Sequence, residues 1–334
     1  MQIVYVGLSG GVDSAVSAAL LKEQGYNVVG AFIKIWRPEF TECTWKEDRI
    51  DAMRVAATLQ IPFREIDLSD EYKKEVVDAM VRDYAAGITP NPDVLCNKVI
   101  KFGSFYEWAR SEGADFVATG HYARIIDKKL FRGKDTKKDQ SYFLHQIDAK
   151  DLPHILFPVG DYEKSQIRAL AKKFDLPNAA RPDSQGLCFV GDISLPEFLS
   201  RYMKLKEGEV LDQEGKTIGK HGGAALYTIG QRHGFTVSDN VPMYVVSIDA
   251  PANSIRVSPN KSDTAVTDIK VEKLSWIRKP ISEDLLVQTR YREAPVASTL
   301  SVNTVHFKEP HIVARGQSSV FYLDDECLGG GKII

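Results

Sequence analysis

Cysteine is scarce in this chain: its 334 residues contain only four, at positions 43, 96, 188 and 327. Four cysteines are too few for a disulfide scaffold at this length, and none forms the Cys-x-x-Cys pair that is typical of structural zinc sites. No apolar run reaches the roughly 18 residues that a membrane-spanning helix needs. Residues 1–6 lack a charged segment followed by a long apolar stretch, so we expect no signal peptide and a cytosolic protein.

An excess of charge of either sign is also missing. The chain has 43 Lys and Arg residues against 45 Asp and Glu residues, a formal net charge of -2. This balance excludes a protein that coats nucleic acid over its whole surface, but it leaves room for a local basic face. The length exceeds the roughly 250–300 residues at which a single core stops growing, which predicts two or three domains.

The first half of the sequence alternates short apolar runs with stretches of helical spacing. This alternation predicts an α/β fold with a parallel, doubly wound sheet. The expected strands cover residues 3–6, 28–33, 63–67 and 116–119.

The pattern changes after about residue 190. Short runs bounded by Gly and Asp follow, and from residue 265 onward apolar residues alternate with polar ones. Such period-two alternation predicts a small β domain of sandwich or barrel type. We expect residues 249–254 to form a hairpin turn. The expected domains are 1–193, 194–263 and 264–334.

One glycine-rich segment between the first strand and the first helix indicates a phosphate site. It reads Gly7-Leu8-Ser9-Gly10-Gly11-Val12-Asp13-Ser14. Glycines let backbone N–H groups approach a phosphate, and the helix N-terminus adds a favourable dipole. Asp13 would repel a phosphate unless Mg²⁺ bridged the two, which indicates a metal-bound nucleotide. The segment fits neither a Walker A loop nor the dinucleotide-binding spacing.

The residues Ser9-Gly10-Gly11-Val12-Asp13-Ser14 resemble the signature of the PP-loop ATP pyrophosphatase superfamily. Members of that superfamily split ATP between its α and β phosphates and adenylate a carbonyl oxygen. They include synthetases of small molecules as well as tRNA-modifying enzymes, so the loop by itself does not select one of them.

Two cysteines stand in loops with many turn-forming residues. Cys96 ends the segment Thr89-Pro90-Asn91-Pro92-Asp93-Val94-Leu95-Cys96, where Pro92 or Asp93 is expected to start a helix. The helix N-terminus and the nearby Lys98 and Lys101 favour a thiolate, although a buried, inert thiol is the alternative. Cys188 follows Arg181-Pro182-Asp183-Ser184-Gln185-Gly186-Leu187. By itself this segment is a weak signal, and a buried thiol is again the alternative.

These parts together suit a sulfur-transfer reaction. ATP turns a carbonyl oxygen into a leaving group, a persulfide on one cysteine supplies sulfur, and a second thiolate cleaves the S–S bond. Essentially the whole chain resembles the tRNA-specific 2-thiouridylase family. The segments that carry this resemblance are residues 7–14, 89–98, 118–122, 138–142, 183–189, 226–232, 290–292 and 316–317.

The resemblance implies ATP-dependent 2-thiolation of the wobble uridine of tRNA, with release of AMP and pyrophosphate. It makes Cys188 the persulfide carrier and Cys96 the catalytic nucleophile. It assigns ATP binding to Gly7, Leu8, Ser9, Gly10, Gly11, Val12, Asp13, Ser14, Ile33 and Gly120, where Ile33 replaces the Met expected from the family. The target base would meet Asn91, Pro92 and Asp93. Contacts with tRNA would come from His121, Lys138, Asp139, Gln140, Arg290, Tyr291 and Gln317.

The implied cofactors are ATP and substrate-bound Mg²⁺, with no metal ion held by the protein itself. The implied partners are tRNA and a cysteine desulfurase or sulfur-relay protein, and we expect a monomer that does not bind membranes. Asp93 lies three residues before Cys96 and therefore on the same helical face. We hypothesise that Asp93 is a catalytic acid, base or sulfur-handling partner.

Three other functions stay open at the level of sequence. A small-molecule adenylating ligase would need no pair of reactive cysteines. A non-catalytic RNA-binding protein would not need Asp13 and Ser14. An iron–sulfur-dependent tRNA thiolase could use Cys96, Cys188 and Asp93 as cluster ligands, although three dispersed ligands are a weak signal. Cys327 follows acidic residues that should raise its pKa and leave it unreactive.

Overall fold

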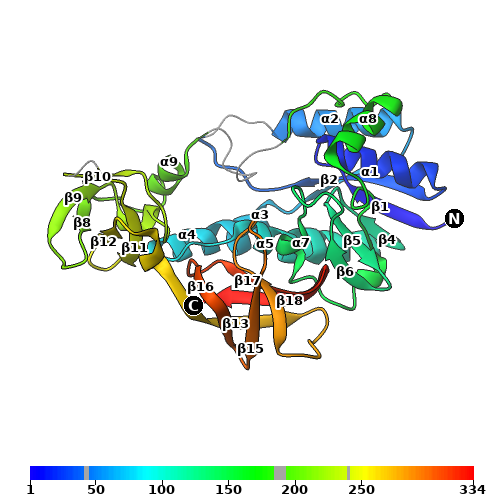
Figure 1. The fold of residues 1–334 in the computed structure, drawn as a ribbon. Coiled ribbons are helices and arrows are strands. Elements are labelled where there is room, and N and C mark those ends of the chain that lie inside the picture. The colour runs from blue at the N-terminus through cyan, green and yellow to red at the C-terminus, as the bar shows by residue number, and fades with distance from the viewer. Residues whose placement is uncertain (41–44, 184–192, 239–240) are drawn as a thin grey trace.

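The computed structural model describes residues 1–40, 45–183, 193–238 and 241–334. An α/β part lies at one end, a small β sheet at the other, and a β barrel beside the middle (Figure 1). None of the helices in these ranges is long and apolar enough to cross a membrane.

The first part contains a parallel sheet with strand order β3-β2-β1-β4-β7. Its strands are β1 (Ile3–Gly7), β2 (Asn27–Lys34), β3 (Phe63–Asp67), β4 (Phe116–Ala118) and β7 (Ile155–Leu156). The order reverses between β1 and β4, and the carboxyl ends of both strands lie at the same edge. In sheets of this type, the crevice at such a reversal is where ligands bind.

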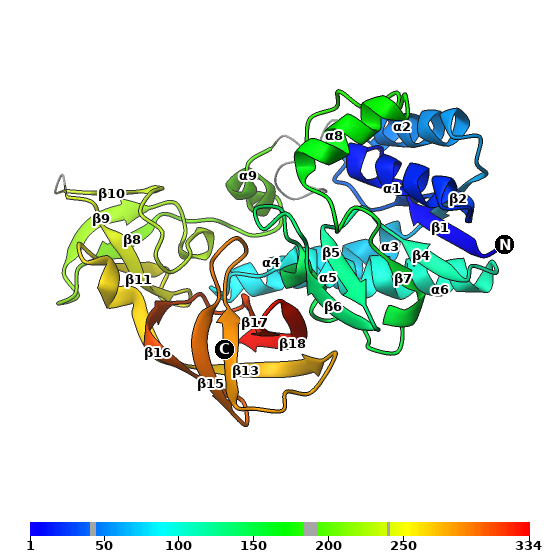
Figure 2. The same cartoon turned by 45° about the vertical axis from the view of Figure 1, so that its right-hand side comes forward.

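Helices cover both faces of this sheet, as Figure 2 shows. Val4 and Val6 of β1 pack with α1 (Val12–Glu23), α2 (Trp45–Thr58) and α8 (Lys164–Lys173). Tyr5, which points the other way, packs with helices on the opposite face. Those helices are α3 (Ser69–Tyr72), α4 (Asp78–Ala85), α5 (Pro92–Leu95) and α6 (Phe105–Ser111), with π-helical turns η1 (Lys73–Val77) and η2 (Cys96–Ser104) between them. The predicted doubly wound sheet is confirmed.

The second sheet has strand order β10-β9-β8-β12-β11. Helix α9 (Leu195–Ser200) leads into it, and a small core around Val210, Val245 and Ile255 holds it together. Residues 249–254 form the predicted hairpin, since β11 and β12 pair antiparallel across them. The strands are β8 (Gly208–Leu211), β9 (Thr217–His221), β10 (Phe235–Val237), β11 (Tyr244–Asp249) and β12 (Ser254–Ser258).

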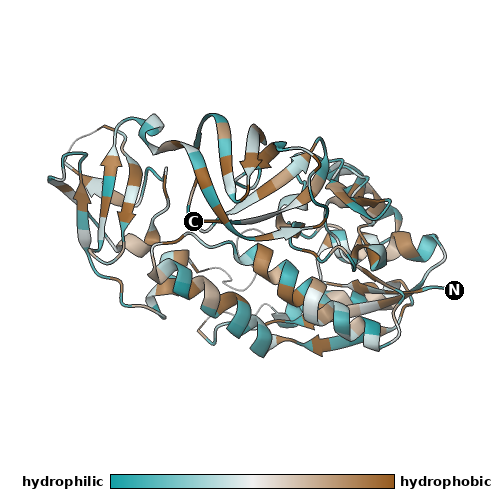
Figure 3. Ribbon diagram, turned by 90° about the horizontal axis from the view of Figure 1, so that it is seen from below, coloured by the Kyte–Doolittle hydropathy of each residue, from teal (hydrophilic) through white to brown (hydrophobic). Residues whose placement is uncertain are grey.

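The C-terminal strands close into a barrel because β13 pairs with both β16 and β18. Hydrophobic and hydrophilic residues alternate along them (Figure 3), and the inward ones, such as Val271, Val287 and Phe321, form the core. The predicted β domain is therefore confirmed, and of the two expected types it is a barrel. Its strands are β13 (Ala265–Trp276), β14 (Asp284–Gln288), β15 (Val296–Ser301), β16 (Thr304–Ile312), β17 (Ser318–Leu323) and β18 (Glu326–Ile333).

A hairpin from the first part of the chain extends the barrel sheet. Strand β5 (Ala123–Ile126) pairs with β6 (Lys129–Arg132), and β6 pairs with β18 through Leu130 and Cys327. Residues 128–138, which include six Lys and Arg residues, begin in this hairpin. Shorter helical segments complete the described chain: α7 (Ser141–Leu144), η3 (Leu152–His154), η4 (Ala224–Leu226) and η5 (Lys261–Thr264).

Candidate active site

The glycine loop leaves β1 at Gly7 and enters α1 at Val12, with Gly11 at the N-cap position. Its turn is held from inside by Ser14, whose hydroxyl donates to Gly11 O at 3.1 Å and accepts from Ser9 N at 3.2 Å. Gly10 has a φ of +79°, and a Cβ there would lie 2.6 Å from Asp48 O. The loop therefore needs glycine at position 10 for both its backbone angle and its close contact.

The other predicted ATP residues border the same edge of the sheet. Gly120 follows β4, and a Cβ on it would lie only 2.7 Å from Ser14 N. Ile33 is half-buried near the end of β2. It lies two positions beyond Ala31, which pairs with Gly7 of β1. The structure thus gathers residues 7–14, Ile33 and Gly120 at the point where the strand order reverses.

Asp13 faces two side chains that were not among the predicted site residues. Lys164 Nζ lies 2.7 Å and 2.9 Å from its two carboxylate oxygens, and the Tyr122 hydroxyl donates to Asp13 Oδ1 at 2.8 Å. Tyr122 belongs to a segment that carried the resemblance, but no pattern pointed to Lys164, which lies 151 positions from Asp13. Only the fold brings these two residues together.

Lys164 also reaches Asp183, which is the last described residue before the gap at 184–192. Asp183 accepts from Lys138 at 2.8 Å and pairs with Lys164 at 2.9 Å and Arg168 at 2.5 Å. Burial raises the pKa of Asp183, but the hydrogen bonds and charges of Lys138 and Lys164 outweigh it and lower the pKa well below its ordinary value. Lys138, predicted to contact tRNA, is thus an ion-pair partner of Asp183 here. Cys188, the predicted persulfide carrier, lies outside the described residues.

A second set of contacts ties the segment before Asp183 to the glycine loop. Asn178 Nδ2 donates to Gly10 O at 2.7 Å, and Arg181 Nη1 donates to the same oxygen at 3.3 Å. Arg181 also forms ion pairs with Asp48 and with Asp51 on α2. Loop and segment are thereby bound to one another.

The predicted reactive turn opens a helix as expected. Pro92 is the first residue of α5, and Asn91 caps it by accepting from Val94 N at 3.4 Å. Cys96 follows directly and is 6% exposed. Burial raises the pKa of Asp93, an effect that the charge of Lys101 partly offsets. A raised pKa favours the protonated carboxyl and suits a group that handles protons.

His121 connects this helix to the ATP side of the site. Its Nε2 lies 3.3 Å from Lys101 Nζ in η2, its Nδ1 lies 2.7 Å from Thr119 Oγ1, and Gly120 precedes it in the chain. The ring is 7% exposed and packs against Phe102 and Phe157. Burial and then the Lys101 charge lower the pKa of His121 well below its ordinary value. Contact between this buried ring and tRNA stays a prediction.

The remaining residues predicted to meet tRNA differ in exposure. Asp139 is buried, and its carboxylate accepts from Gly133 N at 2.9 Å and from Ser141 Oγ at 2.9 Å. Gln140 accepts from Tyr122 N at 3.0 Å. Arg290 is exposed.

Tyr291 packs on Phe143, with ring centroids 4.4 Å apart. Gln317 is half-buried against residues 89 and 90. Of the two, Tyr291 thus contacts α7, whereas Gln317 contacts the segment before the reactive turn.

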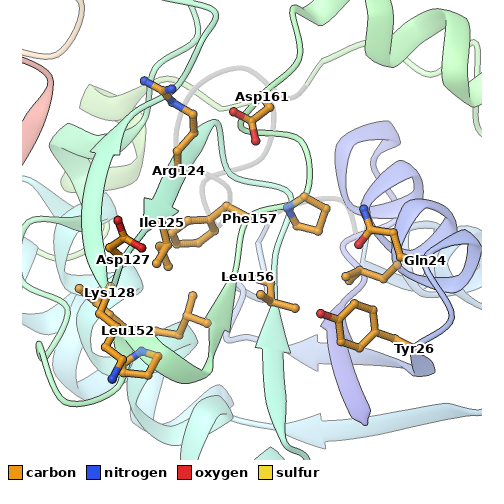
Figure 4. Close-up of a pocket in the computed structure, with 14 residues that line it drawn as sticks. Gln24, Tyr26, Arg124, Ile125, Asp127, Lys128, Leu152, Leu156, Phe157 and Asp161 are labelled. Carbon is orange, nitrogen blue, oxygen red and sulfur yellow. The ribbon is translucent and has the colours of Figure 1, made fainter. Parts of the chain in front are cut away.

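Two features lie away from this site. A cavity of about 430 Å³ sits between β5 and β7 and is bordered by Arg124, Leu156 and Asp161; it contains none of the predicted site residues (Figure 4). Cys327 is fully buried in the barrel sheet. Burial is the main cause that raises the pKa of Cys327 to about 12, and the charges of Asp139 and Glu326 add to it. Burial therefore contributes more than the acidic residues just before Cys327, to which the sequence pointed.

The parallel sheet with its glycine loop defines a PP-loop nucleotide-binding protein followed by two β domains. Three family models match the chain: a tRNA methyl transferase HUP domain over residues 2–192, a tRNA methyl transferase PRC-barrel domain over residues 196–259, and an aminomethyltransferase β-barrel domain over residues 247–333. The tRNA-specific 2-thiouridylase MnmA of Proteus mirabilis is 43% identical, over 99% of this chain and 96% of that protein. The one of Akkermansia muciniphila is 42% identical, over 99% and 98%. The chain belongs to the tRNA-specific 2-thiouridylase family.

One solved structure is similar to the chain at a lower level. A 4-thiouridine synthetase in complex with RNA and ATP is 18% identical, with a TM-score of 0.37, over 60% of this chain and 50% of that chain.

Proposed function

We propose that this protein replaces the C2 oxygen of the wobble uridine of tRNA with sulfur in an ATP-dependent reaction. The observation that carries the proposal is that the nucleotide site and the helix with Cys96 are in contact with one another. The glycine loop and Gly120 form the nucleotide half, and the helix with Cys96 forms the sulfur half. The contact of Lys101 with His121 connects them at the end of β4.

The first step forms an adenylate. The uracil O2 attacks the α phosphorus of ATP, and pyrophosphate leaves. The backbone N–H groups at the N-terminus of α1 bind the phosphates. Mg²⁺ enters with ATP, and Asp13 offers the carboxylate oxygens that this cation prefers.

The second step transfers sulfur. The terminal sulfur of a Cys188 persulfide attacks C2, and AMP leaves with the former carbonyl oxygen. Cys188 Sγ is now joined to the sulfur on C2 by an S–S bond. The Cys96 thiolate attacks Cys188 Sγ, this S–S bond breaks, and the sulfur on C2 becomes the thiocarbonyl sulfur. The products are 2-thiouridine and a Cys96–Cys188 disulfide, which a dithiol reductant must reduce before the next turnover. A cysteine desulfurase or sulfur-relay protein reloads Cys188.

The organisation of the chain follows from this reaction. We assign residues 1–193 to catalysis, residues 194–263 to a small domain that contacts tRNA, and residues 264–334 to the barrel. Arg290, Tyr291 and Gln317 of the barrel and Lys138 of the first domain lie on the tRNA side. The protein acts in the cytoplasm as a monomer.

Thiolation of unmodified tRNA with ATP and Mg²⁺ tests the proposal, with a cysteine desulfurase and cysteine as the persulfide source, a dithiol reductant for turnover, and mass spectrometry of the digested nucleosides. The expected product has the mass of sulfur in place of oxygen; the mass of an added methyl group would instead support the methyl transfer named by the family models. Absence of 2-thiouridine contradicts the proposal.

Cysteine variants assayed with a persulfide donor separate the alternatives. Cys96→Ser and Cys188→Ser should both abolish thiolation, whereas the control Cys327→Ala should retain it because that thiol is buried in the barrel. An adenylating ligase would tolerate both substitutions at the reactive positions. Iron bound stoichiometrically after anaerobic purification would support a cluster in place of the persulfide.

A further inference from the structure

The segment just before the reactive turn is held by both β domains. Thr89 N donates to Arg315 O in the barrel at 2.9 Å. The Thr89 hydroxyl lies 3.0 Å from the hydroxyl of Thr228, in the small central domain. This one residue of the α/β part is therefore bonded to each of the other two parts.

Gln317 of the barrel makes two hydrogen bonds to this segment. Its side-chain Nε2 donates to Thr89 O at 3.1 Å and to Pro90 O at 2.9 Å. A carboxamide nitrogen carries two hydrogens, so both are used by these consecutive carbonyls. Asn91, the cap of α5, is the next residue in the chain.

The backbone beside Gln317 is itself fixed. Gly316 N donates to Ile333 O at 2.8 Å, and Ile333 N donates to Gln317 O at 2.9 Å. Gly316 has a φ of +92°, and a Cβ on it would lie 2.2 Å from Ile88 Cγ2 and 2.6 Å from Thr89 O. The two chain segments approach as closely as their backbones allow.

We propose that Gln317 is a positioning residue, whose side-chain amide fixes residues 89 and 90 from the barrel and thereby holds the turn that carries Asp93 and Cys96. The inference rests on the proposed function only in treating this turn as the reactive one. It differs from a simple tRNA contact because the amide acts on the protein before tRNA binds. Pro90 is three residues from Asp93 and six from Cys96, so loss of the amide loosens the start of their helix.

Alkylation of Cys96 in the tRNA-free, ATP-free protein tests this role, with peptide mapping to separate the four cysteines. Gln317→Met keeps the length of the side chain and removes both donors. We expect Cys96 to react about tenfold faster in this variant, because the segment that buries its thiol opens more often. For the same reason, amide exchange over residues 88–98 should be faster. Gln317→Lys, whose ammonium can again donate to both carbonyls, should restore slow alkylation.

Arg290→Met is the matched control. Arg290 is an exposed residue of the same barrel with a predicted tRNA contact, and its loss should weaken tRNA binding without changing Cys96 alkylation. If Gln317→Met does not fold, Gln317→Asn, shorter by one methylene, gives the same comparison. Unchanged alkylation and exchange together with weaker tRNA binding would overturn the positioning role. Because neither measurement needs turnover, the result stands even where no 2-thiouridine is formed.

Discussion

The Lys164 ammonium lies within hydrogen-bonding distance of both carboxylate oxygens of Asp13, at 2.7 Å and 2.9 Å. Lys164 is mostly buried, with 16% of its side chain exposed. Asp13 stands in the first turn of α1, where the phosphates of ATP would meet its negative charge. Lys164 thus neutralises the one carboxylate of the glycine loop and presents a cation to the incoming nucleotide.

The first prediction concerns this pair. Lys164→Met should weaken binding of ATP with Mg²⁺ by about tenfold, or about 1.4 kcal/mol, because the site loses the ammonium beside Asp13 and only Mg²⁺ is left to offset the carboxylate and the phosphates. Isothermal titration with ATP and Mg²⁺ measures the effect. Lys173→Met is the control, since Lys173 lies on the same helix in an exposed pair with Glu23. Equal affinity of the wild-type protein and Lys164→Met would contradict the role of Lys164.

A second prediction separates backbone strain from steric clash in the glycine loop. Gly10 and Gly25 both have positive φ angles, +79° and +88°, but only Gly10 has a neighbour within reach of a new Cβ. Gly25→Ala should cost about 1 kcal/mol of unfolding free energy, from the backbone angle alone. Gly10→Ala should cost more and also impair ATP binding, because its Cβ would displace Asp48. Denaturant unfolding compares the two, and equal losses would show that the contact with Asp48 is unimportant.

The third prediction concerns Asp93, whose pKa is raised by burial. Asp93→Ala should abolish thiolation while tRNA affinity stays unchanged, since a proton-handling group acts on the chemical step. Filter binding and the nucleoside assay measure the two quantities separately. Asp93→Asn is the isosteric control and should be equally inactive, because it keeps the shape and lacks the acid. Full activity of either variant rules the hypothesis out.

The fourth prediction is a pH dependence of stability that comes from His145. This ring is fully buried between the α/β part and the barrel, and burial lowers its pKa from 6.5 to about 4. Between pH 6.5 and 4 the unfolded chain therefore binds a proton at His145 that the folded chain does not bind. The free energy of unfolding should be highest above pH 6.5 and should fall as the pH drops towards 4. The difference corresponds to roughly 3 kcal/mol.

Unfolding by urea at several pH values checks this dependence. His145→Gln should be less stable at neutral pH and should lose less stability between pH 6.5 and 4. His233→Gln, at an exposed histidine, should follow the wild-type curve. A wild-type stability that does not change over this range would contradict the prediction.

Local sequence patterns were enough to locate the loops of the candidate site and the β domain after residue 265. The glycine loop after the first strand, the helix start at Pro92 and the barrel after residue 265 all follow from turn residues and from periods of two or 3.6. Each of these signals lies within a few consecutive residues. The contacts of individual side chains could not be predicted in this way, because they depend on segments that are distant in the sequence.

Lys164 and His121 illustrate this difference. No spacing marks a single lysine at the start of α8 as the partner of Asp13. The resemblance implied that His121 meets tRNA, yet its ring is buried against Phe102 and Phe157, which no local pattern indicates. The pairing of β6 with β18 likewise joins residues almost 200 positions apart.

That pairing has a consequence for the order in which the chain is made. Strand β6 leaves the ribosome well before β18, which pairs with it through Leu130 and Cys327. An unpaired strand edge is a template for association with other chains. During synthesis the edge of β6 stays unpaired until β18 has been made, so the α/β part is completed only together with the barrel.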